Sequence, residues 1–229
     1  MRRIVTATFV SLDGIMQAPG GPEEDRRGGF AFGGWTAPYW DDAIGAAQNE
    51  VFSAPFDLLL GRRTYDIFAA HWPYMKFDAK AGDFDALVQQ ITDSFNSATK
   101  YVATHSPETL SWQNSQALGS DVAGALGTLK QGDGPTLLVQ GSSDLIQQLL
   151  AADLIDEMRL LIYPVVLGRG KRLFSDGAAP GAFKLVKSTI APSGVIIATY
   201  VRDGDVKTGS FVSENPSPAE LERRNRLSQ

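Results

Sequence analysis

Cysteine is absent from all 229 residues of the sequence. The chain therefore cannot build disulfides, thiol nucleophiles, iron–sulfur clusters or cysteine-ligated zinc sites. Only two histidines occur, His71 and His105, and they do not form the closely spaced pair that is typical of a catalytic zinc site. We therefore expect no metal centre.

Long apolar runs and basic runs are missing as well. No stretch approaches the roughly 18 apolar residues that a membrane-spanning helix needs. The charged start Met1-Arg2-Arg3 is not followed by the apolar core of a signal peptide. The 21 basic and 26 acidic residues give a net charge of −5, without a basic stripe for nucleic acid. We expect a cytoplasmic protein that binds neither nucleic acid nor membranes.

Short apolar, β-prone stretches alternate with helical stretches along most of the chain. This order predicts an α/β fold with a mixed, mainly parallel central sheet flanked by helices. The expected strands cover residues 4–10, 57–60, 100–104, 136–140 and 158–163. The expected helices cover residues 40–52, 64–70, 84–91, 121–130 and 144–151.

The remaining segments are interpreted from their turn residues. The Gly/Pro-rich segment 18–34 is typical of a long mobile loop. Asp203-Gly204-Asp205 predicts an antiparallel C-terminal hairpin between strands 195–202 and 206–212. We expect one domain over residues 1–212, followed by an appendage, 213–229, in which a short helix begins at Ser217-Pro218.

An apolar strand runs into glycine and then into a helix start at two places in the sequence. Glycine lets backbone N–H groups approach an anion closely, and a helix N-terminus offers unpaired donors. Each loop alone also fits a routine turn with a Ser or Thr cap. The two loops are Gly61-Arg62-Arg63-Thr64 and Gly141-Ser142-Ser143.

Several motifs resemble known families. Gly61-Arg62-Arg63-Thr64-Tyr65-Asp66 is similar to the Gly-Arg-x-Thr-[Trp/Tyr]-Glu motif of dihydrofolate reductases. Segments 154–160 and 164–168, with Ser11-Leu12-Asp13-Gly14 and Gly141-Ser142, resemble the reductase domain of riboflavin deaminase–reductases. The order and spacing agree over residues 3–202. The resemblance implies a dihydrofolate reductase-like fold.

The resemblance also implies a binding site for NADPH. Arg62 would lie near the adenosine 2′-phosphate, in a pocket that Thr104 and His105 complete. A histidine in that place would bind phosphate more strongly when protonated, although an exposed loop position explains it equally well. The implied cofactor-binding residues are Gly61, Arg62, Thr64, Thr104, His105, Gly141, Ser142 and Ser143.

Three acids are candidates for catalysis. Asp13 follows a strand and precedes a glycine, so it either shapes a turn or lies beside the nicotinamide, as the resemblance implies. Asp41 and Asp42 lie near the position of the pterin-binding acid of dihydrofolate reductases, but they also fit the start of a helix. Arg169, Lys171 and Arg172 either hold a phosphorylated substrate or are solvated charges.

The resulting hypothesis is an NADPH-dependent oxidoreductase. It would be similar to the 5-amino-6-(5-phosphoribosylamino)uracil reductase of riboflavin biosynthesis and would transfer a hydride to a heterocycle or sugar-derived imine. The alternatives are a dihydrofolate or pteridine reductase, and a non-catalytic nucleotide-binding relative. The family resemblance further implies a homodimer. The cysteine-dependent zinc deaminase of the bifunctional enzymes cannot be built by this chain.

Overall fold

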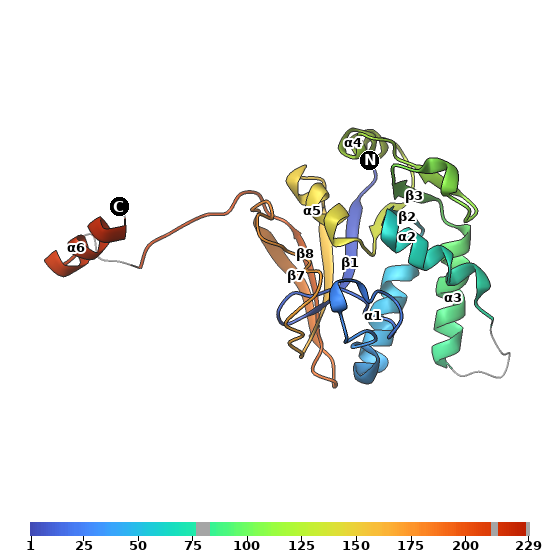
Figure 1. Ribbon diagram of the computed structural model, residues 1–229, viewed down its shortest axis with the longest axis horizontal. Coiled ribbons are helices and arrows are strands. Elements are labelled where there is room, and N and C mark those ends of the chain that lie inside the picture. The colour runs from blue at the N-terminus through green and yellow to red at the C-terminus, as the bar shows by residue number, and fades with distance from the viewer. Residues whose placement is uncertain (77–82, 212–214, 228–229) are drawn as a thin grey trace.

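The chain forms an α/β fold around one eight-stranded sheet (Figure 1). The computed structural model describes residues 1–76, 83–211 and 215–227. The strand order is β4-β3-β2-β5-β1-β6-β8-β7. Strands β1 to β6 are parallel, and β8 pairs antiparallel with both β6 and β7.

Up to β6 the α-helices and strands follow in the order β1-α1-β2-α2-α3-β3-β4-α4-β5-α5-β6. The strands are β1 (Ile4–Ser11), β2 (Phe56–Gly61), β3 (Lys100–Ala103), β4 (Ser115–Ala117), β5 (Thr136–Val139), β6 (Glu157–Tyr163), β7 (Phe183–Ile190) and β8 (Ile196–Arg202). The α-helices are α1 (Asp42–Phe52), α2 (Arg62–Ala69), α3 (Asp83–Ser97), α4 (Val122–Gln131), α5 (Ser143–Ala151) and α6 (Pro218–Leu227).

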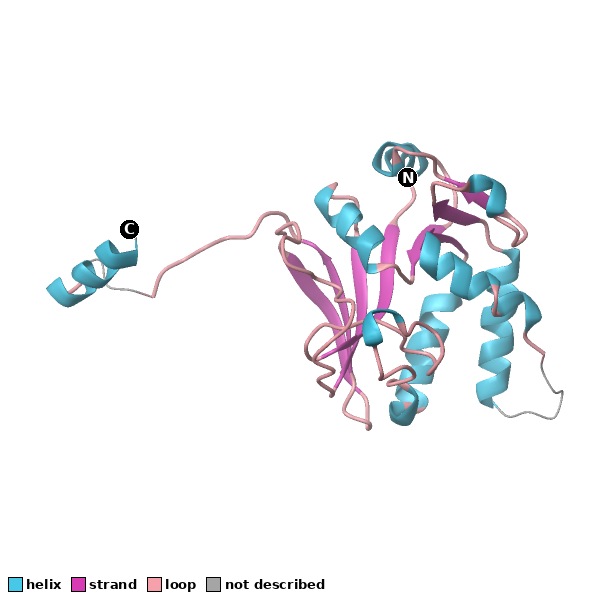
Figure 2. Cartoon of the chain, viewed as in Figure 1, coloured by secondary structure: helices cyan, strands magenta, loops and turns pink. Residues whose placement is uncertain are grey.

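The central strands are apolar because helices cover both faces of the sheet (Figure 2). Every residue of β2 is buried, and its side chains alternate between the two cores. On one face, Leu126 of α4 and Ile146 of α5 pack against the sheet. Phe52 of α1 and Phe95 of α3 fill the other core. None of the helices in the described ranges is both long and apolar enough to cross a membrane.

The antiparallel hairpin exists, but the predicted position of its turn is wrong. The turn lies at Ala191–Val195, where Gly194 has a φ of +85° and its N–H donates to the carbonyl of Ala191. Both edges of β8 are occupied, by β6 and β7, so residues 206–211 have no strand to pair with there. Val212 lies outside the described residues. At Asp203-Gly204-Asp205 the chain only bends: Gly204 has a φ of +78°, but no hairpin turn forms.

The other predicted elements are confirmed with shifted ends. The helix expected at 84–91 continues to Ser97. Sequence reasoning missed β4, which has three residues, and β7, whose exposed, lysine-containing strand lacks an apolar run. Helix α6 begins at Pro218 and is set apart from the body in Figure 1; residues 213–214 and 228–229 of the predicted appendage lie outside the described ones.

Two buried cations lie near the amino ends of the strands. Arg2 pairs with Asp57 of β2, and its Nε donates to the carbonyl of Pro135 at 2.8 Å. Lys100 is fully buried; its Nζ donates to the carbonyl of Asn96 at 2.8 Å and lies 4.3 Å from the ring centroid of Trp112. Burial lowers the pKa of Lys100 to about 8.

This lysine makes stability depend on pH. An unfolded lysine titrates near pH 10.4, so between about pH 8 and 10 the unfolded chain holds more protons than the folded one. The free energy of unfolding contributed by Lys100 therefore rises with pH across this window. We expect Lys100→Met to lack this rise, as measured by urea unfolding from pH 7 to 10. Parallel curves for both proteins would contradict the shifted pKa.

Candidate functional site

The two glycine loops identified in the sequence meet at the carboxyl edge of the sheet. Strands β2 and β5 are adjacent and parallel, with Leu58 opposite Leu138. Both strands therefore end at the same edge, and α2 and α5 both begin there. In open parallel sheets this edge is where ligands bind.

The loops are in direct contact through their glycines. The N–H of Gly61 donates to the carbonyl of Gly141 at 3.4 Å. A Cβ atom at Gly61 would collide with the Ser142 side chain, and one at Gly141 would lie 2.9 Å from Thr64 Oγ1. The peptide bond between Gly141 and Ser142 is cis. The predicted residues Gly61, Thr64, Gly141 and Ser142 thus form a single cluster.

Two helix N-termini open onto this cluster. Ser142 caps α5, and its hydroxyl accepts a hydrogen bond from the N–H of Leu145 at 3.4 Å. Ser143 is buried in the first turn of the same helix. Gly61 precedes α2 without a side-chain cap. Free N–H groups and the positive ends of two helix dipoles make this edge favourable for anions.

Arg62 connects the cluster to the end of β3. Its Nη1 donates to Thr104 Oγ1 and the Ser106 carbonyl, both at 3.2 Å, and to Thr109 Oγ1 at 2.5 Å. Its Nε is paired with Asp66 at 2.8 Å, and that carboxylate is half exposed. The guanidinium is therefore held in place mainly by neutral oxygens, and a surface ion pair neutralises it only weakly.

Of the residues predicted for the 2′-phosphate pocket, Arg62 and Thr104 are in contact. Thr104 is buried, and its Oγ1 also accepts from the N–H of Ser106 at 3.1 Å. His105 is exposed, as is Arg63 on the outer side of α2. Sequence reasoning missed Thr109, which belongs to a short helical turn (Pro107–Thr109) with no motif of its own.

Asp13 fastens the loop that follows β6. Its carboxylate accepts from Ser11 Oγ at 2.6 Å, Leu167 N at 3.1 Å and Gly168 N at 2.7 Å. Desolvation opposes ionisation, but these three donors prevail and lower the pKa of Asp13. The arrangement favours the turn interpretation, since all these donors stabilise the charged form.

Asp41 serves as the N-cap of α1. One carboxylate oxygen accepts from Ile44 N and the other from Ser193 N in the β7–β8 turn, both at 3.0 Å. These donors outweigh desolvation and lower the pKa of Asp41. Asp42 is exposed in the first turn of the helix. Asp13 and Asp41 therefore fasten two different segments, the loop after β6 and the β7–β8 turn.

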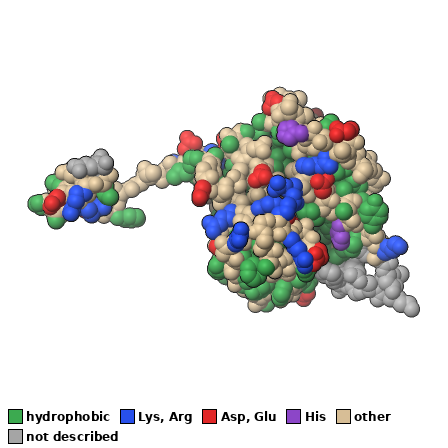
Figure 3. All heavy atoms as spheres, viewed as in Figure 1, with side chains coloured by type: hydrophobic (Ala, Val, Ile, Leu, Met, Phe, Trp, Pro, Cys, Tyr) green, Lys and Arg blue, Asp and Glu red, His purple; other side chains and the backbone are tan. Residues whose placement is uncertain are grey.

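The segment 18–34 is fastened to the loop after β6. Lys171 pairs with the buried Asp25 at 2.6 Å, and the amide of Gln17 donates to the carbonyls of Asp25 and Arg27 at 3.0 Å. Burial opposes ionisation of Asp25, yet hydrogen bonds from Lys171 and Arg27 lower its pKa to about 2. Arg169 and Arg172 are exposed. Figure 3 shows Lys and Arg side chains gathered near the middle of the visible face.

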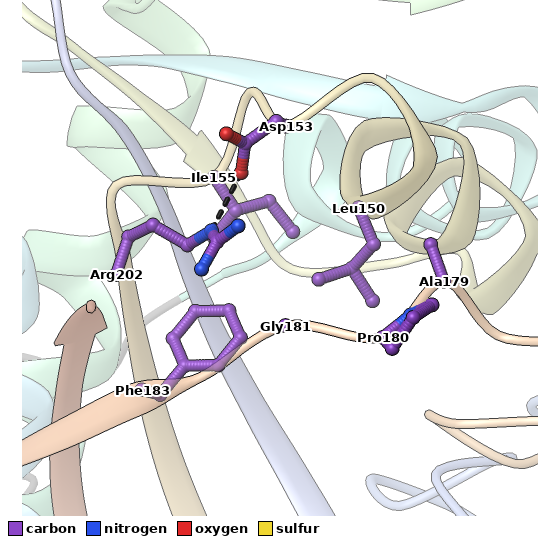
Figure 4. Close-up of a pocket in the computed structure, with 8 residues that line it drawn as sticks. All are labelled: Leu150, Asp153, Ile155, Ala179, Pro180, Gly181, Phe183 and Arg202. Atoms are coloured by element: carbon purple, nitrogen blue, oxygen red, sulfur yellow. Dashed lines mark hydrogen bonds and ion pairs between the residues drawn. The ribbon is translucent and has the colours of Figure 1, made fainter. Parts of the chain in front are cut away.

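Two cavities lie outside this cluster. One, of about 310 Å³, is lined by Tyr74, Asn96 and Trp112 among others. The other is a narrow recess between the end of α5 and the β7–β8 strands, where Arg202 lies over Phe183 and pairs with Asp153 at 2.5 Å (Figure 4). Neither is lined by a residue predicted for cofactor binding. Among the described residues, no group of three His, Asp or Glu side chains could hold a metal ion.

The contact between the loops can be tested by a paired substitution. Gly61→Ala should destabilise the protein by about 1–3 kcal/mol, because its methyl group overlaps the Ser142 side chain. Adding Ser142→Gly should recover most of that loss, since the next atom, Ser142 N, is 3.4 Å away. Urea unfolding of all four proteins measures the coupling. Additive effects would show that the loops do not touch.

The role of Asp41 can be separated into capping and charge. Asp41→Ala should cost about 0.5–2 kcal/mol, whereas Asp41→Asn, also a good N-cap, should cost much less. The lowered pKa means that the stabilisation by Asp41 is lost as the pH falls below about 3.9, and Asp41→Asn should remove this dependence. Thermal unfolding from pH 2.5 to 6 tests both statements. Equal losses for Ala and Asn would disprove the cap.

Comparison with known proteins agrees with the fold. The chain is 26% identical to the uncharacterized protein YyaP of Bacillus subtilis (strain 168) over 205 residues, which cover 89% of this chain and 96% of YyaP. A putative riboflavin biosynthesis protein from Shewanella sp. PV-4 superposes with a TM-score of 0.52 at 21% identity, covering 89% of this chain and 99% of that one. Dihydrofolate reductase from Enterococcus faecalis, complexed with NADP(H), gives 0.51 at 13% identity over 88% and 96% of the two chains. These superpositions show a dihydrofolate reductase-like fold. The family model of the RibD C-terminal domain matches residues 2–197 of this chain, and the chain belongs to that family.

Proposed function

We propose that this chain is an NADPH-dependent reductase that transfers a hydride to a flat nitrogen heterocycle or a sugar-derived imine. The observation that carries the proposal is the junction of Gly61 with Gly141 and Ser142, between the N-termini of α2 and α5. The family is a reductase-type family, and one structural neighbour was solved with NADP(H).

The residues at this edge fit the phosphates of a dinucleotide. Gly61 and Gly141 let the two loops pack together, which brings the starts of α2 and α5 to one place, and Thr64, Ser142 and Ser143 add hydroxyl donors. Arg62 contacts Thr104 at the end of β3, the strand beside β2. These two residues would bind the 2′-phosphate, and the exposed His105 would lie next to it. When bound, the nicotinamide supplies the hydride, and the protein supplies position and charge.

The substrate side involves the acids and the segment 18–34. Asp41 already accepts two backbone hydrogen bonds, so it has little capacity to protonate a pterin. This favours a riboflavin-type reductase over a dihydrofolate reductase. In that reading, Asp13 orients the loop after β6 beside the nicotinamide, and the segment 18–34 excludes water from the reacting atoms.

The proposal is tested by titrating the protein with NADPH and NADH in parallel. Arg62→Ala should weaken NADPH binding roughly 10- to 100-fold, since hydrogen bonds to charged groups are worth about 1.5–3 kcal/mol, and should leave NADH binding nearly unchanged. Arg63→Ala is the matched control, because its side chain is exposed one residue further along α2. Tryptophan fluorescence and thermal stability report binding.

Two outcomes would contradict the proposal. If neither nucleotide binds the unmodified protein, the reductase function is wrong. If Arg62→Ala weakens NADPH and NADH equally, Arg62 supports the fold of the loop and does not contact the 2′-phosphate.

A further inference from the structure

One polar side chain of α1 is buried without a hydrogen-bond partner. Gln48 is 9% exposed and lies on the buried face of the helix, one turn from Ile44 on one side and from Phe52 on the other. Its carboxamide makes no hydrogen bond with any other residue that the structure describes. Buried amides are nearly always paired, because an unpaired one lowers the stability of the fold.

The carboxamide of Gln48 is not sealed inside the core. Among the described residues, the hydroxyls of Thr6, Thr8 and Ser193 are the buried side-chain atoms that have neither a partner nor contact with solvent. Gln48 is not one of this group, so its carboxamide atoms still reach solvent. A ligand that arrives from solvent can therefore contact them.

The packing of α1 places this carboxamide over β1. Ile44 belongs to the apolar cluster that contains Phe9, and Phe52 belongs to the cluster that contains Ala7. Ala7 and Phe9 are alternate residues of β1 and therefore point to the same face of the sheet. Gln48 lies between Ile44 and Phe52 on the helix, and hence over residues 7–9 of the strand.

Strands β1 and β5 separate at this part of the sheet. Strand β5 pairs with β1 only up to Thr6, which lies opposite Val139, whereas β6 stays paired with β1 as far as Ser11. After β5 the chain enters the loop of Gly141 and Ser142 and then α5. The carboxamide from α1 therefore lies near the point of separation, which borders the loop proposed to bind phosphate.

A second carboxamide comes to the same point from the end of β5. Gln140 directly follows Val139 and is thus level with Ala7. Continued strand alternation puts it on the face of Leu138, which is the face that α1 covers. Gln140 is partly exposed, and its side chain also makes no hydrogen bond within the described ranges. Two unpaired carboxamides therefore approach one place from different elements.

The chemistry of a carboxamide selects the kind of group that it binds. It presents an N–H donor beside a carbonyl acceptor, so its complement is an edge with a neighbouring N–H and C=O, as in a lactam ring. Ile44 and Phe52 flank Gln48 with apolar side chains, among which an ion without a counter-charge would be poorly stabilised. An uncharged ring therefore fits this position better than a protonated one.

We propose that Gln48 is a specificity-determining residue, which binds the ring that accepts the hydride and selects an uncharged ring with a lactam edge. Gln140 contacts the same ring from the end of β5. This inference rests on the proposed reductase function, because the cofactor at the neighbouring loops defines where the ring lies. It also gives a reason for an unpaired polar side chain on the buried face of α1.

The test measures the binding of two ring probes to the complex with NADPH, by ligand-observed NMR. 6-Aminouracil is uncharged at neutral pH and has lactam edges, whereas 2,4-diaminopyrimidine has a ring nitrogen that is readily protonated. Gln48→Leu should weaken 6-aminouracil binding roughly tenfold or more, because two hydrogen bonds of ordinary strength are lost, and should leave NADPH binding nearly unchanged.

Two further variants sharpen the result. Gln48→Glu should reverse the preference, so that 2,4-diaminopyrimidine binds more tightly than 6-aminouracil, because a carboxylate favours the protonated ring. Asn49→Leu is the matched control and should change neither affinity, since this neighbouring amide is exposed on the same helix.

Urea unfolding separates recognition from a structural role. Gln48→Leu removes a buried, unpaired amide and should therefore raise the urea concentration at half-unfolding. A lower midpoint would show that the amide supports the fold, and would overturn the inference.

Three binding results would overturn the inference while the proposed function survives. These are NADPH binding without 6-aminouracil binding in the unmodified protein, equal 6-aminouracil binding by the unmodified and Gln48→Leu proteins, and a parallel loss of NADPH and 6-aminouracil binding in Gln48→Leu. An unmodified protein that does not bind NADPH would instead contradict the proposed function and, with it, this inference.

Discussion

The close approach of two strand-to-helix loops is the constraint on which the site depends. Because β2 and β5 are adjacent and parallel, the loops that follow them must pass each other at one edge of the sheet. Gly61 and Gly141 permit that passage, since a Cβ atom at either would overlap the other loop. The same contact places the N-termini of α2 and α5 side by side, and Arg62 extends the cluster to β3. The phosphate-binding character proposed for this edge thus follows from the strand order.

Much of the parallel core could be predicted from the sequence. Continuous apolar stretches such as 58–60 and 137–139 are buried on both faces, and turn residues mark where they end. The C-terminal part was harder. The charged strand β7 resembles a loop because all of its residues after Phe183 are exposed, whereas Asp203-Gly204-Asp205 resembles a hairpin turn although β8 has no free edge. Local signals cannot say which strand edges are already occupied.

The site could be predicted only in part, for a related reason. The resemblance singled out both loops and Arg62 with Thr104, which the fold brings together. It could not show that Asp13 and Asp41 accept hydrogen bonds from distant segments, because Leu167, Gly168 and Ser193 approach them only after folding. Nor could it identify Thr109, whose hydroxyl contacts Arg62 across 47 residues of sequence. Carboxylates that fasten loops and carboxylates that move protons look alike in a sequence.

Amide hydrogen exchange with and without NADPH tests whether the two glycine loops form one dinucleotide site. Binding should slow exchange at residues 61–65 and 141–146 together, at the same NADPH concentration, and at 104–109 beside Arg62. NADH should protect the first two segments and leave 104–109 nearly unchanged. Protection of only one glycine loop, or of residues around the cavity at Trp112 instead, would contradict the account.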